Sequence, residues 1–100
     1  MITADITAEE LKQRLAKGET PVIIDVREDW EHQESKIEGA QNIPLGALPQ
    51  RLDDLEDYKE QEVIVHCKSG MRSASAKAFL QQQGFGQVRN LLGGILAYQE

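Results

Sequence analysis

Cysteine is scarce in this sequence. Cys67 is the single cysteine among 100 residues, so the chain cannot close an internal disulfide. A chain without disulfides is typical of a reducing compartment, and we expect a cytoplasmic protein. Residues 1–5 lack the basic region and apolar core of a secretory signal peptide. No apolar run approaches the ~20 residues that a membrane span needs, so we expect no membrane association.

Carboxylates are absent from residues 63–99, although the whole chain is acidic, with a net charge of −6. Residues 1–62 hold 16 of the 17 acidic and 7 of the 11 basic residues, which gives −9. Residues 63–100 hold one acidic and four basic residues, which gives +3. A locally positive region favours a small anion over nucleic acid, because nucleic-acid binding needs a broad basic surface. An uneven composition without function is the alternative.

Linkers, internal repeats and low-complexity segments are also missing. The chain is 40% hydrophobic and 28% charged, which is typical of a soluble globular protein with one core. We therefore expect residues 1–100 to form a single domain. The six acidic residues within 53–62 indicate a solvated surface, since no convergent set of metal ligands accompanies them.

Short apolar runs predict the strands. Residues 22–26 follow Pro21, and residues 63–65 are three consecutive β-branched residues. Continuous runs of this kind are typical of strands covered on both faces. Residues 87–91 predict the last strand, and residues 39–45 predict a loop with one further short strand.

Helical patterns lie between these strands. Thr7 and Glu10 form a capping-box pattern before a short amphipathic helix that Gly18 ends. Further helices are predicted at residues 28–34, from Arg72 toward Gly84, and at residues 95–99. Another helix is predicted where leucines follow helical spacing, with Pro49 in its first turn; the leucines are Leu45, Leu48, Leu52 and Leu55. The alternation of strands and helices predicts an α/β fold, with helices on both faces of a parallel sheet.

Cys67 lies where the strand at residues 63–65 gives way to a short loop and the next helix. A loop before a helix N-terminus directs backbone N–H groups inward and lies at the positive end of the helix dipole. We expect the thiol there to ionise below its usual pKa of ~8.5, with Arg72 adding a positive charge. Free cysteine is also a common core residue, so a buried inert thiol is the alternative.

Other polar and aromatic residues have weaker functional signals. Asp25 and Arg27 end a predicted strand, where functional groups of open parallel sheets collect. A structural ion pair between neighbouring loops is the other interpretation, and for Asp25 we favour it. His66 precedes Cys67 within a strand, so its side chain should point to the opposite face and have a structural role. We expect Trp30 to pack rather than to stack on a ligand.

Three blocks of the sequence resemble the rhodanese family. Residues 67–73, Cys-Lys-Ser-Gly-Met-Arg-Ser, are similar to the family's active-site loop. A second block resembles its Asp-Val-Arg and Gly-Ala…Asn-Ile-Pro signatures and consists of Asp25, Val26, Arg27, Glu31, Ile37, Gly39, Ala40, Asn42, Ile43 and Pro44. The third block is Gly93-Gly94-Ile95. The sequence departs from the family at Ser35-Lys36, where Gly-His is usual, and at Glu38 and Tyr98, where Pro and Trp are common.

The resemblance implies a rhodanese-like three-layer sandwich with a parallel sheet of about five strands. It implies a sulfurtransferase in which Cys67 takes the sulfane sulfur of thiosulfate, or of another persulfide donor, as a persulfide. The sulfur then passes to cyanide or a thiol, and the reaction needs neither a metal nor an organic cofactor. Asp25 and Arg27 would support the site. Within the active-site loop, Lys68 and Arg72 would attract the anionic donor, and Ser69 and Met71 would shape the mouth of the pocket. Gly70 would allow a backbone conformation that a side chain hinders, and Ser73 completes the loop.

Rival functions are distinguished in part by the loop. Phosphatases and arsenate reductases of related fold have five residues between a Cys and an Arg, whereas four residues separate Cys67 from Arg72. The smaller loop favours sulfur over a tetrahedral phosphate. A non-catalytic rhodanese-like interaction domain often lacks the cysteine that this chain keeps. A persulfide carrier with one protein thiol partner remains an alternative that the sequence does not separate from a free-standing enzyme.

Overall fold

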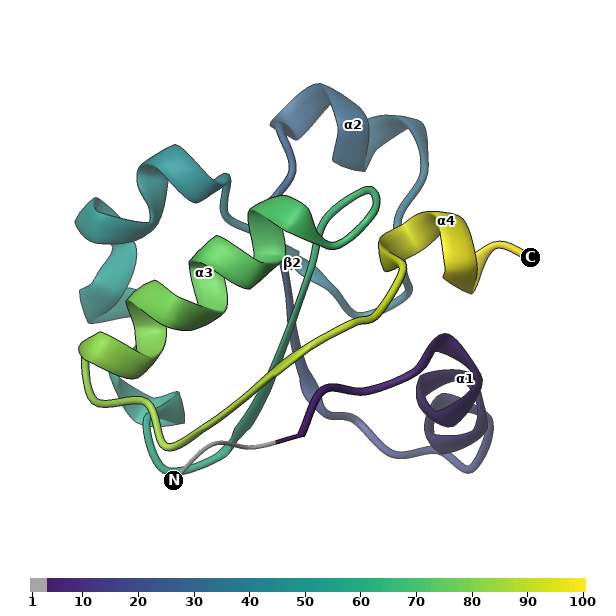
Figure 1. The fold of residues 1–100 in the computed structure, drawn as a ribbon, viewed down its shortest axis with the longest axis horizontal. Coiled ribbons are helices and arrows are strands. Elements are labelled where there is room, and N and C mark those ends of the chain that lie inside the picture. The colour runs from purple at the N-terminus through teal and green to yellow at the C-terminus, as the bar shows by residue number, and fades with distance from the viewer. Residues whose placement is uncertain (1–3) are drawn as a thin grey trace.

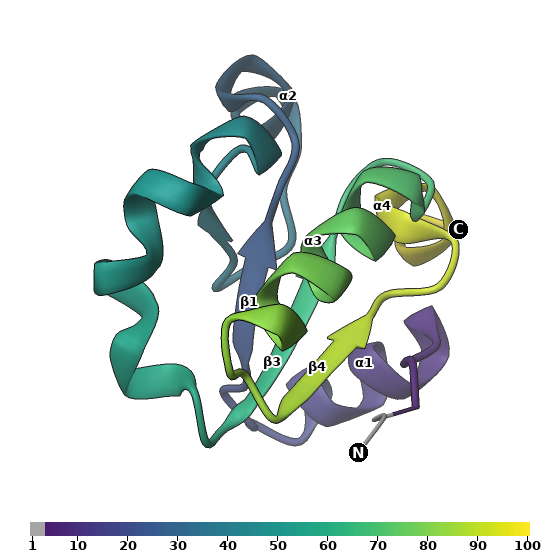
Figure 2. The ribbon, with the colours of Figure 1, turned by 60° about the vertical axis from the view of Figure 1, so that its left-hand side comes forward.

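Four parallel strands run through the middle of the computed structural model, which describes residues 4–100. The strands are β1 (Val22–Asp25), β2 (Gln41–Asn42), β3 (Glu62–His66) and β4 (Gln87–Asn90). Their order across the sheet is β2-β1-β3-β4, and every neighbouring pair is parallel. The arrows of β1, β3 and β4 accordingly point the same way in Figure 2. Parallel strands bring their carboxyl ends to one edge of the sheet, which is where β3 leads into Cys67.

The N-terminal segment supplements the four strands at the outer side of β4. Ile6 forms an isolated parallel bridge with Leu91. Its amide donates to the Asn90 carbonyl oxygen at 3.0 Å, and its own carbonyl accepts from the Leu92 amide at 2.9 Å. We predicted about five strands, and the sheet has four with this single bridge beside them.

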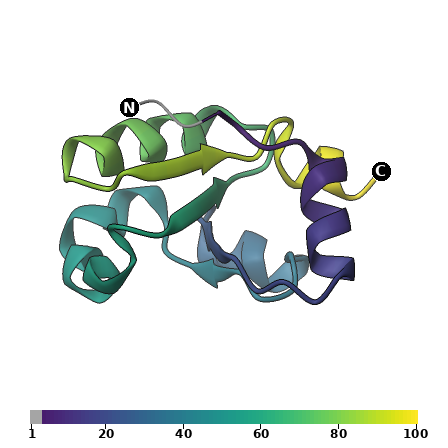
Figure 3. The ribbon, with the colours of Figure 1, turned by 90° about the horizontal axis from the view of Figure 1, so that it is seen from below.

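Helices cover both faces of the sheet, as predicted. The elements are α1 (Ala8–Ala16), α2 (Asp29–Glu34), the 3₁₀ helix η1 (Leu45–Tyr58), α3 (Met71–Gln82) and α4 (Gly94–Tyr98). Figure 3 separates the layers, with α3 and η1 on one side of the sheet and α1 and α4 on the other. Among residues 4–100, no helix combines the length and the apolar character that crossing a membrane requires.

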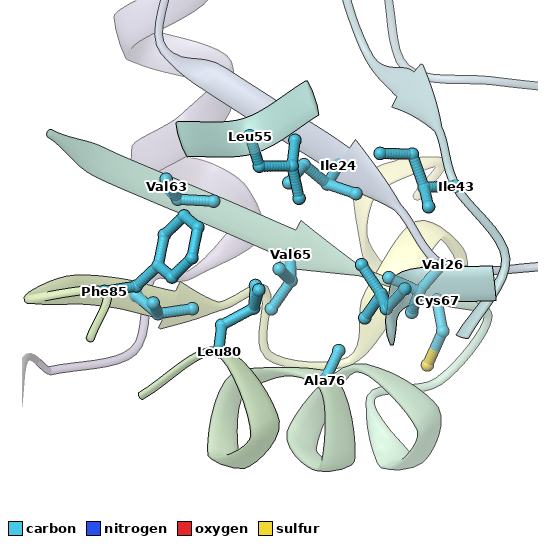
Figure 4. Packing of buried hydrophobic residues seen from close by; sticks show 12 residues of the cluster. Ile24, Val26, Ile43, Leu55, Val63, Val65, Cys67, Ala76, Leu80 and Phe85 are labelled. Atoms are coloured by element: carbon cyan, nitrogen blue, oxygen red, sulfur yellow. The ribbon is translucent and has the colours of Figure 1, made fainter. Parts of the chain in front are cut away.

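Alternating strand residues supply two separate apolar cores. Ile24, Val63 and Val65 point toward α3 and η1, where Leu80 and Leu55 bury them. Figure 4 shows this core, with Cys67 at one end and its sulfur atom near the first turn of α3. The other core faces α1 and α4 and consists of Ile6, Leu11, Ile23, Ile37, Ile64, Leu91 and Ile95. Side chains that alternate across a strand explain why Ile23 and Ile24 enter different cores.

The first helix begins as the capping pattern predicts, with one difference. The Thr7 side chain accepts a hydrogen bond from the Glu10 amide at 3.1 Å. A full capping box would return the Glu10 carboxylate to the backbone of Thr7. That carboxylate instead contacts Arg89 at 3.2 Å, so the long-range ion pair replaces the reciprocal half of the box.

The leucine-rich segment from residue 45 to residue 58 differs from the helix that we predicted. It is a 14-residue 3₁₀ helix, and Pro49 lies inside it rather than in a first α-helical turn. Proline has no N–H to donate within a helix, and its place here is compatible with short, tight turns. Figure 1 shows this teal segment changing direction repeatedly instead of forming one straight cylinder. The leucine spacing still identified core residues, because Leu48 and Leu55 are fully buried.

The packing role that we predicted for Trp30 is wrong. Its side chain is 64% exposed. Trp30 lies on α2, a helix of six residues of which none is buried. The indole therefore has no second layer to cover it.

Candidate active-site loop

Backbone amides from the loop and from α3 surround the sulfur atom of Cys67. Gly70 N lies 3.1 Å and Ser73 N 3.4 Å from Sγ, and both donate to it. Gly70 has a φ of 114°, a left-handed conformation that lets the loop close before α3 begins at Met71. Cys67 is only 1% exposed. The sulfur thus lies at the base of a narrow loop, at the N-terminal end of α3.

These donors lower the pKa of the Cys67 thiol below its usual value. Burial acts in the opposite direction, because it disfavours the charged form. Hydrogen bonds from the Ser73 hydroxyl and from the amides of Ser73, Gly70 and Ser69 outweigh it. The helix dipole of α3 acts in the same sense. The thiol at this position therefore ionises more readily than an isolated cysteine.

The positive charge of Arg72 is not available to the pocket in the way that the sequence suggested. Its Nη1 lies 2.7 Å from Glu31 Oε1, and its Nη2 lies 3.0 Å from Glu31 Oε2. Hydrogen bonding to Arg72 is the main reason why the pKa of Glu31 falls to about 2. Glu31 is thus ionised at neutral pH and neutralises the guanidinium.

The same kind of pairing removes most of the charge asymmetry. Lys77 contacts Asp5 at 2.6 Å, and Arg89 contacts Glu62 at 2.9 Å. In both pairs, acids of residues 1–62 meet bases of residues 63–100. Lys68 differs, since it is exposed and no ion pair of its ammonium group is found among residues 4–100. The local positive field that we expected is therefore reduced to Lys68 and the backbone dipoles.

Asp25 and Arg27 form a buried ion pair at the end of β1. Arg27 Nη2 lies 2.7 Å from Asp25 Oδ2, and the two residues are 3% and 0% exposed. Arg27 also donates to the Ser35 carbonyl oxygen at 2.7 Å, and His32 Nδ1 lies 2.8 Å from Asp25 Oδ2. Burial would raise the pKa of Asp25, but the hydrogen bonds from Arg27 keep it below its usual value. These contacts join β1 to α2 and do not reach Cys67, which favours the structural interpretation of the pair.

His66 points to the face of the sheet opposite Cys67. Asp25 is its partner in the register of β1 and β3, and the ring is fully buried on the Asp25 side. Nδ1 donates to the Cys67 carbonyl oxygen at 3.2 Å. Nε2 lies 3.9 Å from Asp25 Oδ2 and has no hydrogen-bond partner among residues 4–100. Burial lowers the pKa of this imidazole. His66 supports the end of β3 and does not reach the sulfur.

Sequence reasoning missed two parts of the site, since it did not single out Asn90 and identified Gly94 only through the Gly93-Gly94-Ile95 block. Asn90 ends β4 beside β3, and its side chain contacts both Gly70 and Ser73. A polar residue at the carboxyl end of a strand next to β3 was the available signal. The second part is the packing of Gly94, where a Cβ would lie against the Lys68 carbonyl oxygen and 2.7 Å from that of Cys67.

Three large apolar side chains on the loop and on the segment packed against it are exposed. Met71, the last of the four residues between Cys67 and Arg72 and the first residue of α3, is 81% exposed. Leu92 and Leu96 flank the Gly93-Gly94 pair and are 47% and 49% exposed. The Leu96 amide donates to the Lys68 carbonyl oxygen at 3.2 Å, which places the start of α4 against the loop. The segment that carries Leu92 and Leu96 therefore lies close to the loop in space.

Within residues 4–100, no group of three or more His, Cys, Asp or Glu side chains is arranged to hold a metal ion. A pocket of about 560 Å³ is lined by residues that include Leu15, Val22, Tyr58 and Tyr98. It contains no residue of the Cys67 loop, so it is separate from the thiol site.

Comparison with known proteins gives consistent matches along the chain. A family model described as the rhodanese-like domain matches residues 7–100. A sulfurtransferase of Allochromatium vinosum is 39% identical over 94 residues, covering 94% of this chain and 86% of that protein. The crystal structure of SSP1007 from Staphylococcus saprophyticus has 33% identity and a TM-score of 0.85, covering 98% of this chain and 93% of that chain. A tRNA uridine(34) hydroxylase of Cytophaga hutchinsonii is 35% identical over 80 residues, covering 77% of this chain and 26% of that protein.

Proposed function

This chain belongs to the rhodanese-like domain family, and on that premise we propose that it is a sulfurtransferase whose Cys67 carries the sulfur. The proposed donor is thiosulfate or another compound with a sulfane sulfur. The proposed acceptor is cyanide or a thiol. The observation that carries the proposal is the position of Sγ, 3.1 Å from Gly70 N at the N-terminus of α3.

In each of the two proposed steps a sulfur–sulfur bond breaks while the outer sulfur forms a bond to the attacking nucleophile. The Cys67 thiolate attacks the outer sulfur of thiosulfate, the bond to the sulfonate sulfur breaks, and sulfite leaves with the electron pair. Cys67 then holds a persulfide anion. An acceptor thiolate or cyanide attacks its outer sulfur, and the electron pair of the broken bond returns to Sγ as a thiolate.

The loop suits this chemistry because its dipoles are fixed before charge develops. Fixed N–H groups stabilise an anion without the reorganisation that water would need. Four residues separate Cys67 from Arg72, and Arg72 is already bound to Glu31 on both of its terminal nitrogens. A phosphatase would need a larger loop and a guanidinium free to bind phosphate. The geometry therefore favours sulfur transfer over phosphate hydrolysis.

The direct test is mass spectrometry of the intact protein after incubation with thiosulfate. We expect a mass gain of one sulfur atom, located on the peptide that contains Cys67. Addition of cyanide should remove the extra sulfur and release thiocyanate. A protein that stays unmodified by thiosulfate and by an alkyl persulfide donor would contradict the proposal.

The Glu31–Arg72 ion pair leads to a prediction about the donor. We expect Glu31→Gln to raise kcat/KM for thiosulfate about 2- to 10-fold at low ionic strength, because it frees a positive charge next to the loop. Added salt should reduce the gain, since screening weakens the attraction of an anion. Because the pKa of Glu31 is about 2, the wild type keeps this carboxylate ionised throughout the neutral range.

Glu34→Gln is the matched control for this prediction. Glu34 is an exposed carboxylate on the same helix, and it is not among the acids that contact Arg72. Its replacement removes the same unit charge without freeing the guanidinium. Equal rate changes in the two variants would show that only the total charge matters and would contradict a specific role of the ion pair.

A second candidate function is a persulfide carrier that serves a protein thiol. The exposed side chains of Met71, Leu92 and Leu96, on the loop and on the segment packed against it, favour it, because they offer little to a small hydrophilic dianion. Exposed apolar patches mark interaction surfaces more often than isolated apolar residues do.

We expect a cysteine peptide with leucine neighbours to accept sulfur at least several-fold faster than one with glycine neighbours. Leu96→Ser should remove that preference, whereas Gln82→Ser at the far end of α3 should keep it; equal rates for both peptides would contradict the carrier role.

A further inference from the structure

The Ser73 hydroxyl lies between two groups that both compete for its proton. Its Oγ is 2.6 Å from Asn90 Oδ1 and 3.4 Å from Cys67 Sγ. Ser73 is fully buried and Asn90 is 6% exposed, so water does not replace either partner freely. A hydroxyl carries one hydrogen and can donate to only one of these atoms at a time.

The contacts of Asn90 determine which end of its amide faces Ser73. Its Nδ2 lies 3.1 Å from the Gly70 carbonyl oxygen, which can only accept a hydrogen bond. The NH₂ group must therefore face Gly70, because the reverse orientation would bring two acceptors together. Oδ1 consequently faces Ser73 as an acceptor. The backbone amide of Asn90, bound to Asp5 Oδ1 at 2.9 Å, anchors the residue from behind.

We infer that Asn90 is a positioning residue that holds the Ser73 proton away from Sγ while the sulfur is neutral and releases it when the sulfur becomes anionic. This inference rests on the proposed function, which makes Cys67 the reacting sulfur. When Ser73 donates to Asn90, a lone pair of Oγ faces Sγ and can accept from the thiol. When Sγ is a thiolate, the hydroxyl turns to it and leaves Asn90 Oδ1 without a donor.

The two orientations correspond to two stages of the reaction. In the persulfide, the negative charge lies on the outer sulfur, and Sγ is a neutral atom within a sulfur–sulfur bond. The Ser73 proton then returns to Asn90. When an acceptor attacks the outer sulfur, charge returns to Sγ and the hydroxyl turns to stabilise the leaving thiolate. Asn90 thus stabilises the loaded state relative to the free thiolate.

The charged groups around Cys67 have fixed partners or lie outside this contact. Arg72 of α3 is bound to Glu31 of α2, and Lys68 is exposed on the loop. Behind Asn90, Asp5 is bound to Lys77. Substitution of the Asn90 side chain leaves all of these pairs in place. A change in the pKa of Cys67 in such a variant can therefore be assigned to the Ser73 hydroxyl.

The test is a double-mutant cycle read by the pH dependence of Cys67 alkylation with iodoacetamide. In the wild type we expect a midpoint below the usual ~8.5. Asn90→Leu, which has a similar shape and no acceptor, should lower that midpoint by roughly one pKa unit, because it frees the hydroxyl for the thiolate. Ser73→Ala should raise it. In the Ser73→Ala background, Asn90→Leu should leave the midpoint unchanged.

The cycle separates this role from a merely structural one. In Asn90→Leu the Gly70 carbonyl oxygen still accepts a hydrogen bond from the Ala74 amide, at 3.0 Å, so it is not left without a partner. Asn90→Ala is a second variant, whose smaller side chain cannot crowd its neighbours. An alkylation midpoint that rises in both Asn90 variants, or that shifts equally with and without Ser73→Ala, would overturn the inference.

NMR of the wild type gives an independent reading, because the Asn90 side-chain NH₂ signals should titrate with the Cys67 midpoint. Signals that do not change with pH would also overturn the inference. Alkylation does not require sulfur transfer, so failure of the thiosulfate test leaves this result interpretable.

Discussion

Replacement of Cys67 by serine is expected to abolish sulfur transfer from thiosulfate, with a loss of roughly a thousandfold or more. A serine hydroxyl ionises far less readily than a thiol, and it cannot form a persulfide. Cys67 is the single cysteine of the chain, so no second thiol can substitute for it. The fold should persist, because the serine oxygen can accept the same hydrogen bonds from Gly70 N and Ser73 N. Thiocyanate formation measures the loss, and thermal unfolding monitors the fold.

Cys67→Ala is the companion variant. It removes the acceptor as well as the nucleophile, so the two loop amides lose their partner. We expect it to be as inactive as Cys67→Ser. Substantial turnover by either folded variant would disprove a covalent mechanism through Cys67.

Replacement of Gly94 by alanine is expected to destabilise the protein by about 2–4 kcal/mol and to disrupt the Cys67 loop at the same time. Gly94 has a φ of 61°, and a Cβ there would collide with the carbonyl groups of Lys68 and Cys67. Those carbonyls also accept the amides of Leu96 and Ile95, so backbone on both sides must move. Chemical denaturation measures the loss of stability, and sulfur loading by thiosulfate should fall by at least tenfold.

Gly39→Ala is the matched control for the effect at Gly94. Gly39 also has a positive φ, 85°, but nothing lies within 4 Å of a Cβ built on it. Its substitution should cost about 1–2 kcal/mol from backbone strain alone and leave sulfur loading intact. If the two variants were equally stable and equally active, the contact between α4 and the loop would not position the site.

Much of the fold could be predicted from local sequence patterns. The β-branched run Val63-Ile64-Val65 lies in β3, and the run that begins at Val22 lies in β1. Alternation along a strand also correctly predicted that His66 and Cys67 lie on opposite faces. These predictions succeeded because burial and backbone preference act over a few neighbouring residues. The same local reasoning identified the buried leucines of η1 but not its 3₁₀ geometry, because leucine spacing indicates which residues are buried more reliably than the type of helix.

The sequence by itself determined the α/β class and located the single thiol at the junction of a strand and a helix. Only the tertiary structure decided the charges and the proton donors around that thiol. Glu31 and Arg72 are 41 residues apart, and Ser73 and Asn90 are 17 apart, so no periodic pattern links either pair. Packing of α2 against the start of α3 removes the free charge that Arg72 suggested. The end of β4 beside β3 brings Asn90 to Ser73. Such contacts depend on which elements become neighbours, and that depends on the whole fold rather than on any local segment.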